Sequence, residues 1–155
     1  MRELDASGTA AVVAIQRLQA AYGDGVTRRA WDEVAALFEP EAVVHIDTRT
    51  REPFTLDGPD AIVTFIERSL EAFAFFEFAI LNAVVDLTTA DTATGRVYIC
   101  ELRHHTAGEW TQAYGLYRDD YVRRDGAWRI AGRRYRSLAR TGPRIESFGI
   151  PNDSD

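Results

Sequence analysis

The sequence predicts an α+β fold, in which three N-terminal helices cover one face of a curved antiparallel sheet in a cone-shaped domain. In the first half of the chain, apolar residues recur at three- and four-residue steps, the spacing of helices that bury one side. In the second half the period changes to two and stays there over four segments. Helices followed by a run of strands is the element order of α+β proteins.

Three helices and one short strand are predicted in the first part of the chain. The first helix covers 9–26, where apolar residues form one stripe. The second begins near Trp31 and ends at Pro40, because proline disfavours a helical residue before it. Residues 42–47 are rich in β-branched side chains and predict a short strand. The third helix covers about 58–73 and starts with Gly-Pro, a common helix start.

Four long strands follow, joined by the turn-like sequences TTAD, HTAG and RDG. Their predicted bounds are 76–87, 92–104, 110–123 and 127–138. Helices can cover one face of such a meander, which leaves the other face for a partner. We therefore expect a homo-oligomer, a homodimer or a homotrimer.

Length and charge limit the classes of protein. The 155 residues suit a single domain, 1–155, with a core at about 9–140 and a polar C-terminal tail, 141–155. The 24 acidic side chains outnumber the 18 basic ones, and this negative field disfavours nucleic acid as a partner. Most of the arginines of the hairpin 121–135 are expected to project to solvent and to neighbouring acids.

Cysteine and hydropathy add further expectations. The single cysteine, Cys100, cannot form an internal disulfide, and the three histidines have no metal-ligand spacing, so no metal is expected. The N-terminal residues lack a secretory signal pattern, and no apolar run approaches the roughly 20 residues of a membrane helix. A soluble, cytoplasmic protein without a membrane partner or an organic cofactor is expected.

Three stretches together resemble a known family. They are W-D-x-V-A-A-L-F-x-P-x-A-V from Trp31, G-P-x-A-I from Gly58, and G-L-Y-x-D-x-Y-V-R-R-D-G-x-W-R-I-A-x-R from Gly115. Their order and spacing resemble the SnoaL-like branch of the nuclear-transport-factor-like superfamily over about 9–140. Relatives include scytalone dehydratase, hexachlorocyclohexane dehydrochlorinase, ketosteroid isomerase, polyketide cyclases and the small subunit of aromatic-ring dioxygenases. The resemblance implies a cone with a pocket, and a fold alone does not specify a reaction.

The resemblance also implies a catalytic pattern that this chain keeps only in part. In the dehydratase and dehydrochlorinase relatives a histidine is the general base, an aspartate orients it, and an arginine stabilises the leaving group. The aspartate position falls on Thr27 and the histidine position on Phe78, whereas the arginine is present as Arg133. Because phenylalanine accepts no proton, either other residues perform the chemistry or the cone only binds.

Several residues are candidates to replace the missing base. His45 could pair with Asp47 on one strand face, although a half-exposed strand histidine is the favoured interpretation. His104 could line the cavity by strand parity with Tyr98, or lie at the surface at the strand end. Glu101, like Glu77, would have a raised pKa if buried in its apolar strand, but placement on the outer face is favoured for both.

These assignments give two functional hypotheses. The first is a cofactor-independent lyase (dehydratase) or isomerase (cyclase) acting on a small hydrophobic oxygenated ring compound. Its base would be His45 or His104, and Arg133 and Tyr117 would stabilise negative charge. The alternative is a non-catalytic small-molecule-binding or assembly subunit, and the enzyme is slightly favoured because most relatives use such a pocket for chemistry. The residues expected to bind the ligand are Tyr22, Thr27, Trp31, Phe65, Phe78, Tyr98 and Tyr135.

Overall fold

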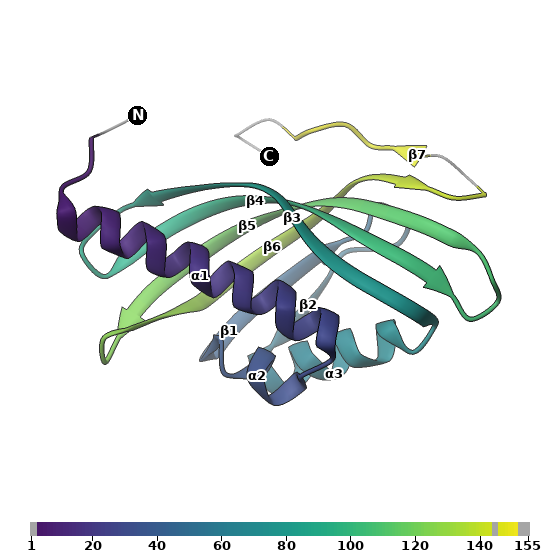
Figure 1. The fold of residues 1–155 in the computed structure, drawn as a ribbon, viewed down its shortest axis with the longest axis horizontal. Coiled ribbons are helices and arrows are strands. Elements are labelled where there is room, and N and C mark those ends of the chain that lie inside the picture. The colour runs from purple at the N-terminus through teal and green to yellow at the C-terminus, as the bar shows by residue number, and fades with distance from the viewer. Residues whose placement is uncertain (1–2, 144–145, 152–155) are drawn as a thin grey trace.

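A computed structural model describes residues 3–143 and 146–151 of the chain. It confirms the predicted fold class: three helices pack against a curved sheet that does not close (Figure 1). The helices are α1 (Ala6–Arg28), α2 (Trp31–Ala35) and α3 (Gly58–Leu70). None of these described helices combines the length and the apolar character needed to cross a membrane.

The sheet contains the four predicted long strands and three shorter ones. The strands are β1 (Phe38–Asp47), β2 (Phe54–Asp57), β3 (Phe73–Leu87), β4 (Thr92–His105), β5 (Trp110–Arg124), β6 (Ala127–Thr141) and β7 (Glu146–Ser147). They are arranged in the order β2-β1-β6-β5-β4-β3, and β7 pairs with β6. The meander β3–β6 is antiparallel as predicted, but β1 joins β6 in parallel, so the sheet is mixed.

The predicted bounds are wrong around the second helix. It ends at Ala35, and Phe38 already belongs to β1, which therefore starts before the predicted strand. Pro40 lies within β1 instead of ending a helix. The register between β1 and β6 shifts between Phe38 and Val43. Proline has no N–H to donate, so strands accept it at such an irregularity. The prediction also missed β2 and β7, which have four and two residues.

The third helix is shorter than predicted, and the tail is described only in part. It ends at Leu70, and Phe73 opens β3 with its ring centroid 5.8 Å from that of Phe76. Of the predicted tail 141–155, residues 144–145 and 152–155 lie outside the described residues. Next to β7, Phe148 donates its backbone N–H to the carbonyl of Leu138 at 2.7 Å, which places this segment along β6.

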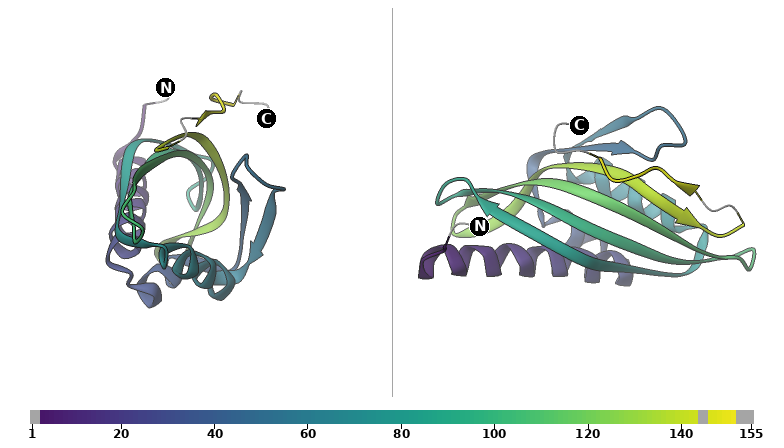
Figure 2. Two further views of the ribbon diagram at one scale, coloured as in Figure 1. Left: turned by 90° about the vertical axis from the view of Figure 1, so that its right-hand side faces the viewer. Right: turned by 90° about the horizontal axis from the view of Figure 1, so that it is seen from above.

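The sheet curls strongly on itself, and the helices lie beside the curl (Figure 2). Helix α1 lies along β3, and α3 lies against β1. The apolar stripe of α1 buries Ile15 and Val26, which join Ile62 of α3 and Ile99 of β4 in one core. Burial of such side chains is the main favourable contribution to folding, at roughly 1.5–3 kcal/mol each. The rigid wall that results positions the site described below.

Candidate active site

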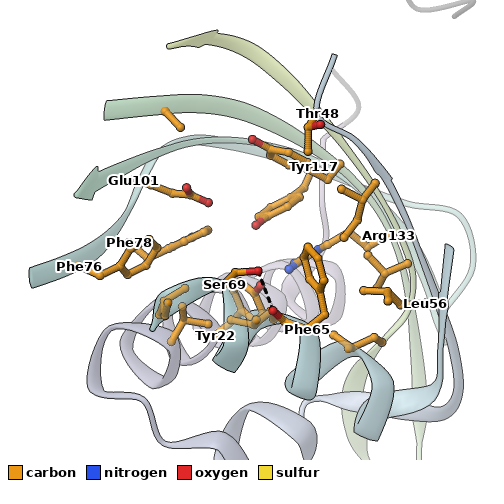
Figure 3. Close-up of a pocket in the computed structure, with 18 of the residues that line it drawn as sticks. Tyr22, Thr48, Leu56, Phe65, Ser69, Phe76, Phe78, Glu101, Tyr117 and Arg133 are labelled. Atoms are coloured by element: carbon orange, nitrogen blue, oxygen red, sulfur yellow. Dashed lines mark hydrogen bonds between the residues drawn. The ribbon is translucent and has the colours of Figure 1, made fainter. Parts of the chain in front are cut away.

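The sheet, α1 and α3 enclose a cavity of about 220 Å³. All six strands from β1 to β6 and both of these helices contribute to its lining (Figure 3). The apolar part of the lining is Val26, Phe38, Val44, Ile46, Leu56, Ile62, Phe65, Ile66, Leu70, Phe73, Phe76, Phe78 and Ala113. The polar part is Tyr22, Thr48, Ser69, Glu101, Arg103, Tyr117, Arg133, Tyr135 and Arg140. A mostly apolar hollow with a few polar groups is the usual form of a small-molecule site.

The polar side chains reach the cavity because they share the inner face of the meander. Side chains alternate along a strand, so every second residue of β4 points inward. Across the sheet, Glu101 is in register with Ala113 of β5, which is in register with Arg140 of β6. Asp119 of β5 is likewise in register with Arg133 of β6. The fold therefore brings two cross-strand rows, each with one carboxylate and one arginine, to the same side of the sheet.

Arg133 is held by a buried polar network. Its side chain is 3% exposed, and Nε and Nη2 each donate to a carboxylate oxygen of Asp119 at 2.7 Å. The hydroxyl of Tyr121 donates to the same carboxylate at 2.7 Å, and Gln19 of α1 donates to that hydroxyl at 2.8 Å. Buried charges are tolerated when they are paired and hydrogen-bonded in this way. The network fixes the orientation of the guanidinium.

The guanidinium of Arg133 also lies between two phenol rings. Its carbon is 3.9 Å from the ring centroid of Tyr117 and 4.3 Å from that of Tyr22, which are cation–π distances. Burial raises the pKa of Tyr22, and raises the pKa of Tyr117 well above its ordinary value. Both phenols therefore keep their protons and can donate them in hydrogen bonds. Nη1 of Arg133 is buried and has no hydrogen-bond partner among the described residues.

Glu101 is the carboxylate in the cavity lining. Its side chain is 21% exposed, and desolvation raises its pKa above the ordinary value, partly offset by the positive charges of Arg103 and Arg140. The nearest oxygen is 3.6 Å from Nη1 of Arg103. Glu101 and Arg133 point into the cavity from opposite sides (Figure 3). A carboxyl with a raised pKa can take up and release a proton closer to neutral pH than a free glutamate.

The three histidines all lie outside the lining of this cavity. His45 is exposed, its Nδ1 is 3.0 Å from the hydroxyl of Thr55, and it borders a separate surface hollow. Asp47 is close to Arg49 and Arg136 and makes no ion pair with His45. The ring of His104 stacks on Trp110 at 4.6 Å at the end of β4. The structure thus separates these candidates from Arg133 and Tyr117.

The residues predicted to bind a ligand divide into two groups. Tyr22, Phe65, Phe78 and Tyr135 line the cavity, as do Arg133 and Tyr117. Thr27, Trp31 and Tyr98 do not. Trp31 packs against the core at the start of α2. Tyr98 lies on the face of β4 opposite to Glu101, because the two are an odd number of residues apart.

Thr27 has a structural contact instead. Its hydroxyl accepts a hydrogen bond from the backbone N–H of Phe78 at 3.0 Å, so it joins the end of α1 to β3. We expect Thr27→Val to lower the free energy of unfolding by about 1–3 kcal/mol, because this part-buried N–H loses its acceptor. Urea unfolding measures the difference. Thr27→Ser keeps the hydroxyl and serves as the control; equal losses in both variants would contradict this assignment.

Sequence reasoning missed Arg103, Arg140 and Asp119 and favoured an outer position for Glu101. The usable signal was the alternation of β4, since Val97, Ile99 and Glu101 share one face and the first two are fully buried. Tyr98, Cys100 and Leu102 make the opposite face apolar as well. With both faces apolar, the sequence did not show which one enclosed the cavity.

Comparison with solved structures agrees with this fold. A hexachlorocyclohexane dehydrochlorinase of type 2 superimposes with a TM-score of 0.80 at 20% identity, covering 96% of this chain and 99% of that one. A candidate scytalone dehydratase from Novosphingobium aromaticivorans also gives 0.80 at 22% identity, with 94% and 98% covered. A type 3 dehydrochlorinase from Novosphingobium barchaimii gives 0.78 at 21% identity, with 96% and 100% covered. No significant match was found among curated proteins.

The fold and the enclosed cavity together define a cone-shaped α+β protein with a mostly apolar internal cavity. The model of the SnoaL-like domain matches residues 8–134, most of the chain. The protein therefore belongs to the SnoaL-like domain family, as the sequence motifs predicted.

Proposed function

We propose that this protein is a proton-transfer enzyme, a lyase or an isomerase, which acts on a small hydrophobic oxygenated ring compound. One observation supports this above all: the Glu101 carboxylate and the Arg133 guanidinium point into one apolar cavity from opposite sides. A base facing an oxyanion-stabilising group is the arrangement that proton abstraction next to a carbonyl requires.

In the proposed reaction, ionised Glu101 removes a proton from the carbon next to a substrate carbonyl. The electron pair of the broken C–H bond forms a carbon–carbon double bond, and the π pair of the carbonyl moves to its oxygen. There the guanidinium of Arg133 and the hydroxyl of Tyr117, which lie together in the lining, stabilise the negative charge. In an isomerase, Glu101 returns the same proton to another carbon. In a dehydratase, the enolate expels a β-hydroxyl, which takes the proton and leaves as water.

The surroundings of Arg133 suit it to stabilise an oxyanion, and those of Glu101 suit it to act as a base. The Asp119 carboxylate keeps the Arg133 side chain ionised and fixed, so no reorganisation is needed as charge develops. Phe76 and Phe78 lie beside Glu101 in the lining and limit its contact with water. Lower solvation makes a carboxylate a stronger base, which its raised pKa expresses.

Two small ring ketones test this proposal. Isomerisation of 3-cyclohexenone and dehydration of 3-hydroxycyclohexanone both give 2-cyclohexenone, whose conjugation is followed by ultraviolet absorbance. We expect saturable conversion of at least one of them, and the one converted distinguishes the isomerase from the dehydratase. Binding of both ketones, measured by NMR, without conversion of either would contradict the proposal and favour the non-catalytic alternative.

A further inference from the structure

We propose that the natural ligand of this cavity carries a carboxylate, and that Arg103 and Arg140 bind it. This inference concerns the substrate class and rests on the proposed function for its catalytic meaning. It is independent of Arg133, whose charge Asp119 already neutralises. The observations are the charge balance of the lining, two buried donors without partners, and the apolar wall beside them.

The cavity has a surplus of positive charge. Its lining contains the three arginines Arg103, Arg133 and Arg140 against one carboxylate, Glu101. Asp119, which is not part of the lining, neutralises the charge of Arg133. One guanidinium charge is left without a carboxylate in the site. The whole chain has a formal net charge of −6, so this local surplus does not follow from composition. A monoanionic ligand would balance it.

Two buried donors mark where the anion would bind. Nε of Arg103 and Nε of Arg140 are buried and lack a hydrogen-bond partner among the described residues. The rest of each guanidinium is held in place: Nη2 of Arg140 donates to the carbonyl of Thr48 at 3.3 Å, and Nη1 of Arg103 is 3.6 Å from Glu101. Unpaired buried donors are costly, and a carboxylate oxygen is their strongest acceptor.

The sheet register places both arginines near Glu101, one along its own strand and one across the sheet. Arg103 lies two residues beyond Glu101 on the inner face of β4, and Arg140 lies across the small side chain of Ala113. The Arg103 guanidinium also lies 5.5 Å from the ring centroid of Phe73, at the apolar wall. A ligand with a hydrocarbon ring against this wall would present its carboxylate to the arginines.

Benzoate and benzamide test this inference, because they share ring and shape and differ in charge. We expect calorimetry on the unmodified protein to show benzoate binding at least about tenfold more tightly, the effect of one charge-assisted hydrogen bond. Arg140→Met should weaken benzoate binding far more than benzamide binding and so remove that preference. Glu101→Gln should tighten benzoate binding, because it removes a neighbouring negative charge. The control is Arg134→Met, on the same strand but 59% exposed, which should change neither affinity.

The outcomes separate this inference from the proposed function, because binding is measured at equilibrium without turnover. Equal affinities for the two probes, tighter binding of benzamide, or no saturable benzoate binding would each overturn the anionic ligand class. That comparison needs no variant, so it holds even if an arginine substitution impairs folding. If the benzoate result is negative but the ring ketones are converted, the proposed function still holds. If the ketones are not converted but benzoate binds more tightly than benzamide, the inference about the ligand still holds.

Discussion

Replacing Asp119 with alanine should lower the free energy of unfolding by about 3–5 kcal/mol, the cost of leaving a buried charge without its partner. The reason is the burial of Arg133, whose Nε and Nη2 both donate to this carboxylate at 2.7 Å. The same substitution removes the acceptor of the Tyr121 hydroxyl. Urea unfolding followed by circular dichroism measures the loss.

Two further variants isolate the ion pair as the cause. Asp119→Leu combined with Arg133→Met removes both charges, and we expect it to be more stable than Asp119→Ala alone, because no buried charge remains unpaired. Arg134→Met changes an exposed arginine of the same strand and should have an effect within about 0.5 kcal/mol. A loss below about 1 kcal/mol in Asp119→Ala would show that water or another group compensates Arg133.

Replacing Glu101 with glutamine should lower kcat for the ring ketones by about 10²–10⁴-fold, the usual contribution of a positioned general base. Glutamine keeps the size of the side chain, but its neutral amide is not a base in water near neutral pH. The affinity for benzamide should stay unchanged, which separates lost chemistry from lost folding. Glu77→Gln is the matched control, since Glu77 lies exposed on the outer face of β3. An unchanged kcat in Glu101→Gln would remove this residue from the mechanism.

The rate of the proposed reaction should fall at low pH. The base is the ionised carboxylate, and burial raises its pKa above the ordinary 4.5. The rate should therefore be full above that raised pKa and fall as the pH drops through it, at higher pH than a free glutamate would give. The positive charge of Arg103 lowers this pKa, so Arg103→Met should move the fall to still higher pH. The Glu101→Gln variant should not show this fall in rate.

The meander was the part of the fold that the sequence predicted best. Its four strands have an uninterrupted period of two and clear turns, and their observed ends differ from the predicted ones by three residues or fewer. The start of β1 was missed because Phe38 continues the helical spacing begun at Trp31, and Pro40 was interpreted as the end of that helix. What makes this segment a strand is its pairing with β6, a contact between distant parts of the chain that no local pattern contains.

The candidate site was predicted only in part, because its composition also depends on contacts between distant parts of the chain. The motif of the last strands contains Arg133 and Tyr117, which line the cavity, and the absence of a histidine at Phe78 was evident from the sequence. Glu101 could not be selected, because both faces of β4 are apolar in sequence and only the packing of the helices decides between them. The homodimer or homotrimer, the cytoplasmic location and the catalytic roles stay predictions.

The parallel pairing of β1 with β6 has a consequence for biosynthesis. Val44 pairs with Arg133, which lies near the end of the chain. Most of the polypeptide must therefore leave the ribosome before β1 has a paired strand on both of its edges. Folds with such long-range pairings form slowly, and nascent strands with free edges attract other chains. Prematurely terminated products that lack β6 should therefore aggregate, and production at low temperature or with chaperones should favour recovery of the intact protein.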